Sequence, residues 1–231
     1  MKEERKAILR QAEDARPSEG GLVAARIEAC DVVLAVTGDG PRRGGEGAAA
    51  LCDAARPAAF IGAGIAGALT PGLAVGDVVV GRRIFDARGE VPAPDARLLE
   101  RAIAAGGAAV TLQSVDRPAV SRGERAVLAE ALGAERLGAA DMESAAWARA
   151  AAARGVPYLV VRAISDALED ELPAYLPRCV GADGRIRRVA VVAHALRQPA
   201  TIPTLLRMRR RVARCGEKLA LFLRALLAEG C

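Results

Sequence analysis

Residues 157–166 read Pro-Tyr-Leu-Val-Val-Arg-Ala-Ile-Ser-Asp, a largely apolar run that ends in polar and charged side chains. Such a run is typical of a strand that is buried on both faces of a sheet. Strand and helix patterns alternate upstream of it, at residues 76–80 (strand), 95–105 (helix), 109–113 (strand), 123–132 (helix) and 142–153 (helix). This alternation favours an α/β layered fold. Nearer the amino terminus the sequence predicts a helix at residues 2–13, a hairpin of strands at 22–27 and 31–37, and a helix at 47–55.

The length of 231 residues fits one domain, and a hydrophobic content of 52% is enough for a full core. This composition excludes wholesale disorder. No apolar stretch approaches the ~18 uncharged residues that a transmembrane helix needs. The charged residues 1–6 do not resemble a signal peptide, so we expect a cytoplasmic protein.

The cysteines and the histidine limit the chemistry that the chain can perform. Five cysteines are scattered without a Cys-x-x-Cys pair, which favours reduced thiols over disulfides or zinc ligands. The single histidine, His194, leaves little from which to build a histidine metal site or a Ser-His-Asp triad. We therefore expect no metal and no cofactor.

The positive charge is confined to the carboxyl-terminal part of the chain. Residues 201–231 hold seven basic and two acidic side chains, which accounts for the whole net charge of +5. The neutral remainder argues against a nucleic-acid-binding core. We expect a domain at residues 1–186 and a basic helical extension at 187–231, packed on the same domain. The extension is either the solvated face of a packed helix or a contact with a membrane surface.

A glycine motif at Gly62, Gly64 and Gly67 matches the Gly-x-Gly-x-x-Gly spacing of dinucleotide-binding proteins, with Asp86 further along. That fingerprint needs a helix directly after the third glycine. Here the strand pattern at residues 76–80 follows too soon for a helix of ten or more residues. We therefore reject a Rossmann interpretation and expect these glycines to bring backbone N–H groups close to a ligand.

Two acidic segments could carry chemistry. Asp141 and Glu143 begin a predicted helix, and Asp166 with the nearby Arg162 ends the buried run. In a parallel sheet, ligands bind beyond the carboxyl ends of strands, where a buried carboxyl group can act as an acid. The alternative is that these carboxylates cap helices and turns, and spacing alone favours that alternative.

Four segments together resemble the nucleoside phosphorylase and nucleosidase family, especially the branch that hydrolyses 5′-methylthioadenosine and S-adenosylhomocysteine. They lie at residues 37–40, 66–79, 141–144 and 161–166, in the order and spacing of the family. The resemblance implies a three-layer α/β/α sandwich around a mixed, barrel-like sheet. It also implies a homodimer that takes a purine nucleoside as its small-molecule partner and breaks the bond between ribose and base.

The resemblance assigns roles to individual residues. Asp166 matches the general acid at purine N7, and Glu143 matches the carboxylate that holds the 2′- and 3′-hydroxyls. Glu4 (or Glu3) matches the base that activates water. Further residues match substrate-binding or orienting positions: Met142 on the ribose, Arg162 and Ser165 orienting Asp166, and Gly38, Gly64, Ile65, Ala66 and Gly67 in the loops around the substrate.

Departures from the family favour water over phosphate as the nucleophile. Gly62 and Ile65 occupy the positions where phosphorolytic members hold phosphate with an arginine and a hydroxyl, and Asp39 adds negative charge nearby. Arg42 or Arg43 could substitute as a phosphate ligand. The sequence thus predicts a nucleosidase that releases adenine, with a phosphorylase or a nucleoside-binding protein without turnover as alternatives.

Two further departures concern the ends of the chain. The family places a β-strand before the catalytic glutamate, and here that strand would precede Met1. The proline-containing helical tail looks more like the hopanoid-associated branch, which removes adenine from adenosylhopane. A lipid-linked substrate would suit a basic amphipathic tail.

Overall fold

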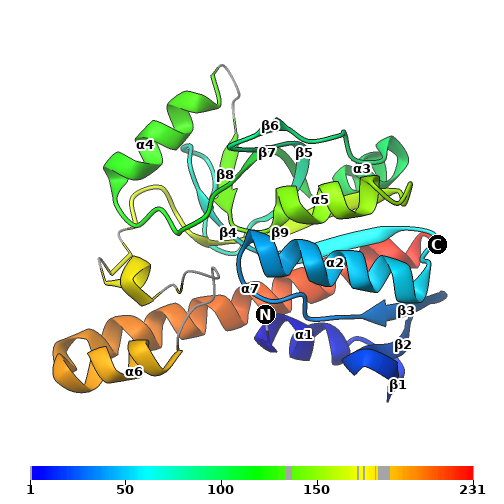
Figure 1. The fold of residues 1–231 in the computed structure, drawn as a ribbon, viewed down its shortest axis with the longest axis horizontal. Coiled ribbons are helices and arrows are strands. Elements are labelled where there is room, and N and C mark those ends of the chain that lie inside the picture. The colour runs from blue at the N-terminus through cyan, green and yellow to red at the C-terminus, as the bar shows by residue number, and fades with distance from the viewer. Residues whose placement is uncertain are drawn as a thin grey trace.

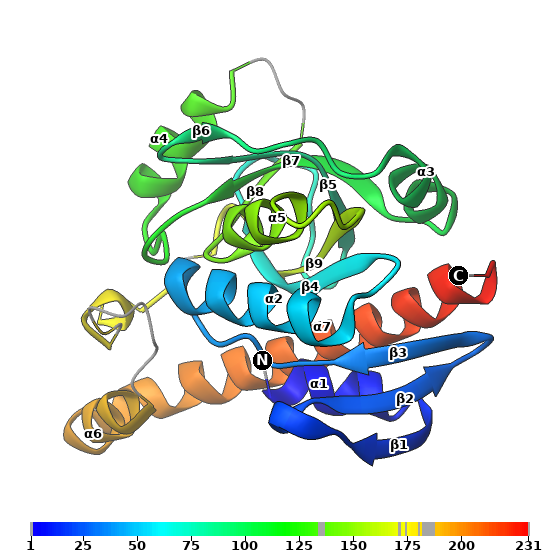
Figure 2. The ribbon, with the colours of Figure 1, turned by 45° about the vertical axis from the view of Figure 1, so that its right-hand side comes forward.

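The computed structural model describes residues 2–133, 137–170, 172–173, 175–179, 181 and 188–230 (Figure 1). Its centre is a mixed sheet in the order β6-β5-β7-β8-β4-β9. The strands are β4 (Phe60–Ala68), β5 (Val78–Asp86), β6 (Gly89–Glu90), β7 (Ala108–Ser114), β8 (Gly138–Asp141) and β9 (Tyr158–Asp166). β5 also pairs with β9, which closes five of these strands into a barrel (Figure 2). The expected barrel-like α/β fold is confirmed.

The predicted buried strand is the central element of this barrel. β9 pairs in parallel with β4 and antiparallel with β5, so its backbone groups are satisfied on both sides. Every residue of β9 is buried except Ser165, which is half-buried. The continuous apolar pattern therefore reflects burial on both faces, as we expected.

A separate three-stranded sheet precedes the barrel. It consists of β1 (Glu13–Pro17), β2 (Val23–Ile27) and β3 (Cys30–Leu34), with a short 3₁₀ helix η1 (Glu19–Gly21) between the first two strands. β2 and β3 form the predicted antiparallel hairpin. The sequence did not indicate β1 because all five of its residues are exposed and it shows no apolar alternation. Because β1 begins at Glu13, the first helix does not reach residue 13 as predicted and ends at Leu9.

Helices cover the barrel and the small sheet. They are α1 (Lys2–Leu9), α2 (Pro41–Ala55), α3 (Ala96–Ala104), α4 (Arg122–Ala131), α5 (Ser144–Ala152), α6 (Arg188–Arg197) and α7 (Ile202–Ala228), with 3₁₀ turns η2 (Leu176–Cys179) and η3 (Pro199–Thr201). α2 starts six residues earlier than predicted. Pro41 occupies its first turn, where a missing N–H costs nothing.

The long helix α7 has two different halves. Cys215, Leu219, Phe222 and Leu226 of its second half are buried in a core cluster shared with α1 and β9. Its amino-terminal end extends beyond the barrel alongside α6 (Figure 1). The division of the chain at residue 186 stays a prediction, and this packing supports the part of it that places the tail on the same domain. No helix among the described residues is long and apolar enough to cross a membrane.

The cysteines are only partly as expected. Cys52, Cys179 and Cys215 are free thiols, and all three are buried. Cys30, however, is disulfide-bonded, which corrects the expectation of reduced thiols for that residue.

We expect Leu219→Ala to destabilise the whole protein, because Leu219 is 0% exposed and links α7 to the barrel. The loss of a buried leucine side chain should lower the free energy of unfolding by about 2–5 kcal/mol in urea denaturation. Leu221→Ala in the same helix is the matched control, since Leu221 is 54% exposed and should change stability by less than about 0.5 kcal/mol. Equal effects would show that α7 is not part of the core.

Candidate active site

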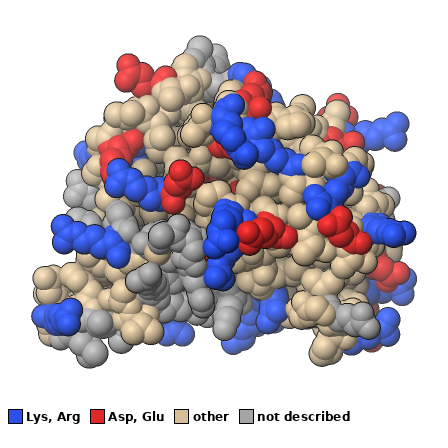
Figure 3. Space-filling model, viewed as in Figure 1, with Lys and Arg blue, Asp and Glu red and all other residues tan. Residues whose placement is uncertain are grey.

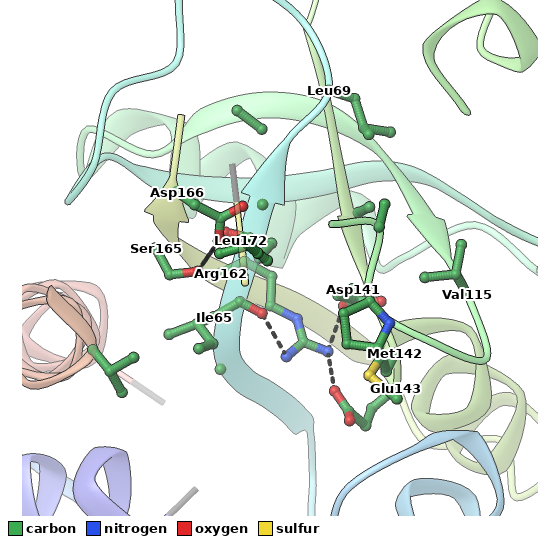
Figure 4. Close-up of a pocket in the computed structure, with 18 of the residues that line it drawn as sticks. Ile65, Leu69, Val115, Asp141, Met142, Glu143, Arg162, Ser165, Asp166 and Leu172 are labelled. Carbon is green, nitrogen blue, oxygen red and sulfur yellow. Dashed lines mark hydrogen bonds and ion pairs between the residues drawn. The ribbon is translucent and has the colours of Figure 1, made fainter. Parts of the chain in front are cut away.

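A cavity of about 320 Å³ lies at the carboxyl-terminal parts of β4, β8 and β9 (Figure 4). It brings Glu4 of α1 together with Glu143 and Asp166, although these carboxylates are far apart in the sequence. The cavity is also lined by seven other predicted residues: Gly64, Ile65, Ala66, Gly67, Met142, Arg162 and Ser165. Gly38 is not among the lining residues, and its neighbour Asp39 takes that place.

Several lining residues were not found by sequence reasoning. They come from α4, from the segment after β9 and from α7: Arg125, Leu172, Met208, Arg211 and Val212. For Met208 and Val212 the sequence predicts only that they lie on an amphipathic helix. Nothing in the sequence predicts that this helix packs against the cavity. Pro118 also lines the cavity.

Arg162 is the most highly connected side chain of the site. It is 1% exposed and forms an ion pair with Asp141, hydrogen bonds to Ser144 Oγ at 2.9 and 3.0 Å, and a contact of 3.5 Å with Glu143 (Figure 4). Its guanidinium also lies over the Trp147 ring, 4.3 Å from the ring centroid. These partners correct the expectation that Arg162 orients Asp166: it orients Asp141 and Glu143 instead.

Glu143 stands at the amino-terminal cap of α5, but its side chain does not cap that helix. One carboxylate oxygen accepts a hydrogen bond of 2.8 Å from the backbone N–H of Gly40, and the other lies near Arg162. Burial raises the pKa of Glu143, and Arg162 opposes that rise. The capping alternative therefore does not describe Glu143, whose carboxylate is directed into the cavity lining.

Asp166 ends β9 and is held at both oxygens. Ser165 Oγ donates to Oδ1 at 2.6 Å, as expected, and Arg125 donates to Oδ2 at 2.5 Å. Burial is the main cause that raises the pKa of Asp166, while Arg125 and Ser165 lower it. A carboxyl group with a raised pKa at the wall of a cavity is suited to donate a proton.

The glycines of β4 make room for buried side chains. A Cβ atom at Gly62 would overlap Trp147, one at Gly64 would overlap Arg162, and one at Gly67 would meet Asp166. β4 leads to β5 through turns and without a helix, which confirms the rejection of a Rossmann interpretation. These contacts correct the expectation that the glycines expose N–H groups to a ligand. Their role is to leave space for buried side chains.

The cavity lining carries more negative than positive groups. Five carboxyl groups line it, together with three arginines. Each of these arginines has a carboxylate partner: Arg125 pairs with Asp166, Arg162 with Asp141, and Arg211 with Asp170 at 2.7 Å. Within the described part of the chain, no group of three or more His, Cys, Asp or Glu side chains could hold a metal ion. The arrangement suits proton transfer and the stabilisation of a cation.

Sequence comparisons relate this chain to known proteins. The profile of the phosphorylase superfamily matches residues 1–178. A 5′-methylthioadenosine/S-adenosylhomocysteine nucleosidase of Haemophilus influenzae (strain PittEE) is 30% identical over 181 residues, which cover 70% of this chain and 79% of that relative.

Solved structures share the fold. An S-adenosylhomocysteine nucleosidase from Streptococcus pyogenes superposes with a TM-score of 0.74 at 21% identity, covering 99% of this chain and 93% of that one. A Campylobacter jejuni 5′-methylthioadenosine/S-adenosyl homocysteine nucleosidase gives 0.75 at 17% identity, with coverage of 100% and 96%. A futalosine hydrolase mutant of Helicobacter pylori gives 0.71 at 16% identity, with coverage of 100% and 96%.

We expect Gly64→Ala to destabilise the protein because its Cβ would displace the buried Arg162 guanidinium. Overpacking of this kind should lower the free energy of unfolding by about 1–3 kcal/mol in urea denaturation. Gly45→Ala in α2 is the control. Its Cβ would meet Ala146 at an ordinary 3.5 Å, and alanine should stabilise the helix by up to about 1 kcal/mol. Wild-type stability of Gly64→Ala would contradict a packing role for this glycine.

Proposed function

The chain belongs to the phosphorylase superfamily, and from this we propose that it hydrolyses the N-glycosidic bond of an adenosine-type nucleoside and releases adenine. The observation that carries the proposal is the convergence of Glu4, Glu143 and Asp166 on one cavity. The curated relatives named as nucleosidases support the same class of reaction. The protein is accordingly an N-glycosidase.

Each carboxyl group has a task in this reaction. Asp166 donates its proton to the purine, which leaves as a neutral base. Glu143 accepts hydrogen bonds from the ribose hydroxyls, with Met142 packed against the sugar. Glu4, which is 4% exposed, accepts a proton from the attacking water. Negative charge beside a sugar that develops oxocarbenium character also lowers the barrier in a site shielded from solvent.

Water fits the cavity better than phosphate does. A phosphate dianion would enter a lining of five carboxyl groups, and its three arginines already have carboxylate partners. A buried charge without compensation is costly. Arg42 and Arg43 do not line the cavity, and Arg42 lies 3.4 Å from Glu46. Phosphorolysis is therefore the alternative, and it is distinguished from hydrolysis by comparing the products formed with and without phosphate.

The 5′ substituent is the finer part of the proposal. Methylthioadenosine, adenosylhomocysteine and an adenosylhopane-like nucleoside are the three substrates that we propose. The lipid-linked substrate has support from the first half of α7, where the exposed Ile202 and Leu206 lie beside Arg207, Arg209 and Arg210. This half would be the contact with a membrane surface. The homodimer and the cytoplasmic location stay predictions.

Nucleic acid is not among the proposed partners. On the face shown in Figure 3, Lys and Arg side chains alternate with Asp and Glu side chains and form no continuous basic surface. A nucleic-acid-binding face usually concentrates basic groups along one groove or helix.

We expect adenine release to proceed at the same rate in phosphate buffer and in phosphate-free buffer, with the free sugar as the second product. The physical reason is the negative lining of the cavity. Chromatography for adenine and an assay for sugar 1-phosphate measure the two products. Substantial sugar 1-phosphate would make the protein a phosphorylase. Absence of adenine after hours of incubation with all three substrates would leave a nucleoside-binding protein without turnover.

We also expect a 2′-deoxynucleoside to react at least about 100-fold more slowly than the ribonucleoside, because Glu143 would lose a hydrogen-bonding partner. Glu143→Gln should narrow this ratio, since a neutral amide binds hydroxyls more weakly than a carboxylate. Glu46→Gln on the exposed side of α2 is the control and should leave the ratio unchanged. Equal rates for both sugars in the wild-type enzyme would remove Glu143 from ribose recognition.

A further inference from the structure

Arg125 is a buried charge on a helix that is otherwise at the surface. It is 1% exposed and is the one buried side chain that α4 contributes. A buried guanidinium is unfavourable unless it is paired and hydrogen-bonded. Arg125 meets both conditions: Nη2 binds Asp166 Oδ2 at 2.5 Å, and Nη1 binds the carbonyl oxygen of Ala167 at 2.7 Å. The second bond fixes the guanidinium on the backbone just beyond β9.

The two partners of Asp166 act on different oxygens. Ser165 binds Oδ1, and Arg125 binds Oδ2. The plane of the carboxyl group is therefore defined by one neighbour in the chain and by one cation that is 41 residues away. Arg125 itself lines the cavity beside Asp166.

We propose that Arg125 is a positioning residue that orients Asp166 and stabilises the carboxylate formed when Asp166 gives its proton to the purine. The inference rests on the proposed hydrolysis. In that step the proton passes from Asp166 to the base, and the electron pair of the C1′–N9 bond goes to the purine ring. Water adds to C1′ and gives a proton to Glu4, and exchange with solvent then returns both carboxyl groups to their starting states.

Arg125 balances two requirements that conflict. Burial raises the pKa of Asp166, which favours the protonated form that can donate. The same burial would make the resulting carboxylate very unfavourable without a compensating cation. A guanidinium at hydrogen-bonding distance limits the rise in pKa and strengthens the acid in the transition state.

Other charged groups near Asp166 are already engaged. Asp170, which follows β9, pairs with Arg211 of α7. Cys215 of α7 donates a hydrogen bond to the carbonyl oxygen of Ile164. Burial raises the pKa of Cys215 to about 11, so this thiol stays neutral. The remaining titratable groups of the cavity are Glu4 of α1, Asp39, and the Asp141–Glu143–Arg162 cluster. Among the described residues, Arg125 is the cation that forms an ion pair with Asp166.

The test is the pH dependence of kcat in Arg125→Met and Arg125→Lys. If Asp166 must be protonated, kcat falls as pH rises through its pKa. Loss of the cation raises that pKa, so the alkaline limb of Arg125→Met should move upward by about one pH unit or more. Its kcat at neutral pH should fall by about 10- to 100-fold, because the acid becomes weaker, while KM changes little. Arg125→Lys, which keeps the charge, should restore the position of the limb.

Two further variants separate positioning from general stability. Arg149→Met breaks a partly buried ion pair with Asp86, away from this cavity, and should leave the limb in place. In the background of Asp166→Asn, adding Arg125→Met should cost little further turnover, because the group through which Arg125 acts is already lost. This double variant removes both charges of the pair, so no buried charge is left without a partner. It can therefore be compared with Asp166→Asn even if Arg125→Met alone folds poorly.

An unmoved alkaline limb in Arg125→Met, or losses that add fully in the double variant, would overturn the role of Arg125. Wild-type turnover in Asp166→Asn would instead overturn the proposed acid, and with it this inference. If the wild-type protein binds adenine without turnover, the proposed hydrolysis fails. The pH dependence of adenine affinity in the wild type and in Arg125→Met then tests the coupling, and identical profiles overturn it.

Discussion

The arrangement of the site depends on the buried guanidinium of Arg162. Arg162 lies in the middle of β9 and is 1% exposed, so its charge requires partners from other elements. The end of β8 supplies Asp141, and the start of α5 supplies Glu143 and Ser144. β4 must approach closely enough that only glycine fits at Gly64. These contacts of one guanidinium therefore join β4, β8, β9 and the start of α5 at the cavity.

The glycine-rich strand shows how one pattern can have two physical meanings. Glycine weakens a strand because it has no side chain to pack and more backbone freedom to lose. β4 offsets that loss by parallel pairing with β9 along nearly its whole length. The space left by Gly62, Gly64 and Gly67 is filled by side chains from other elements. The spacing thus matches a nucleotide fingerprint, while its cause is packing.

Local patterns were sufficient for part of the structure and insufficient for the rest. The burial of β9 and the β2–β3 hairpin follow from side chains within each strand, so the sequence could predict them. The place of Glu143 and Asp166 at the cavity followed from a family resemblance. Arg125 could not be found in this way, because its role depends on a contact across 41 residues. The exposed β1 also gave no signal, since no face of it is buried.

Two of the three proposed functional carboxyl groups, Glu143 and Asp166, have separate arginines, and this separation bears on the reaction. Arg162 lies against Asp141 and Glu143, whereas Arg125 lies against Asp166. Each of these two arginines compensates the negative charge of a neighbouring carboxylate. Neither arginine is therefore available to attract an anion such as phosphate. The lining as a whole remains negative. A cavity of this kind stabilises positive charge on the sugar between its carboxylates, and it disfavours a phosphate dianion for the same electrostatic reason.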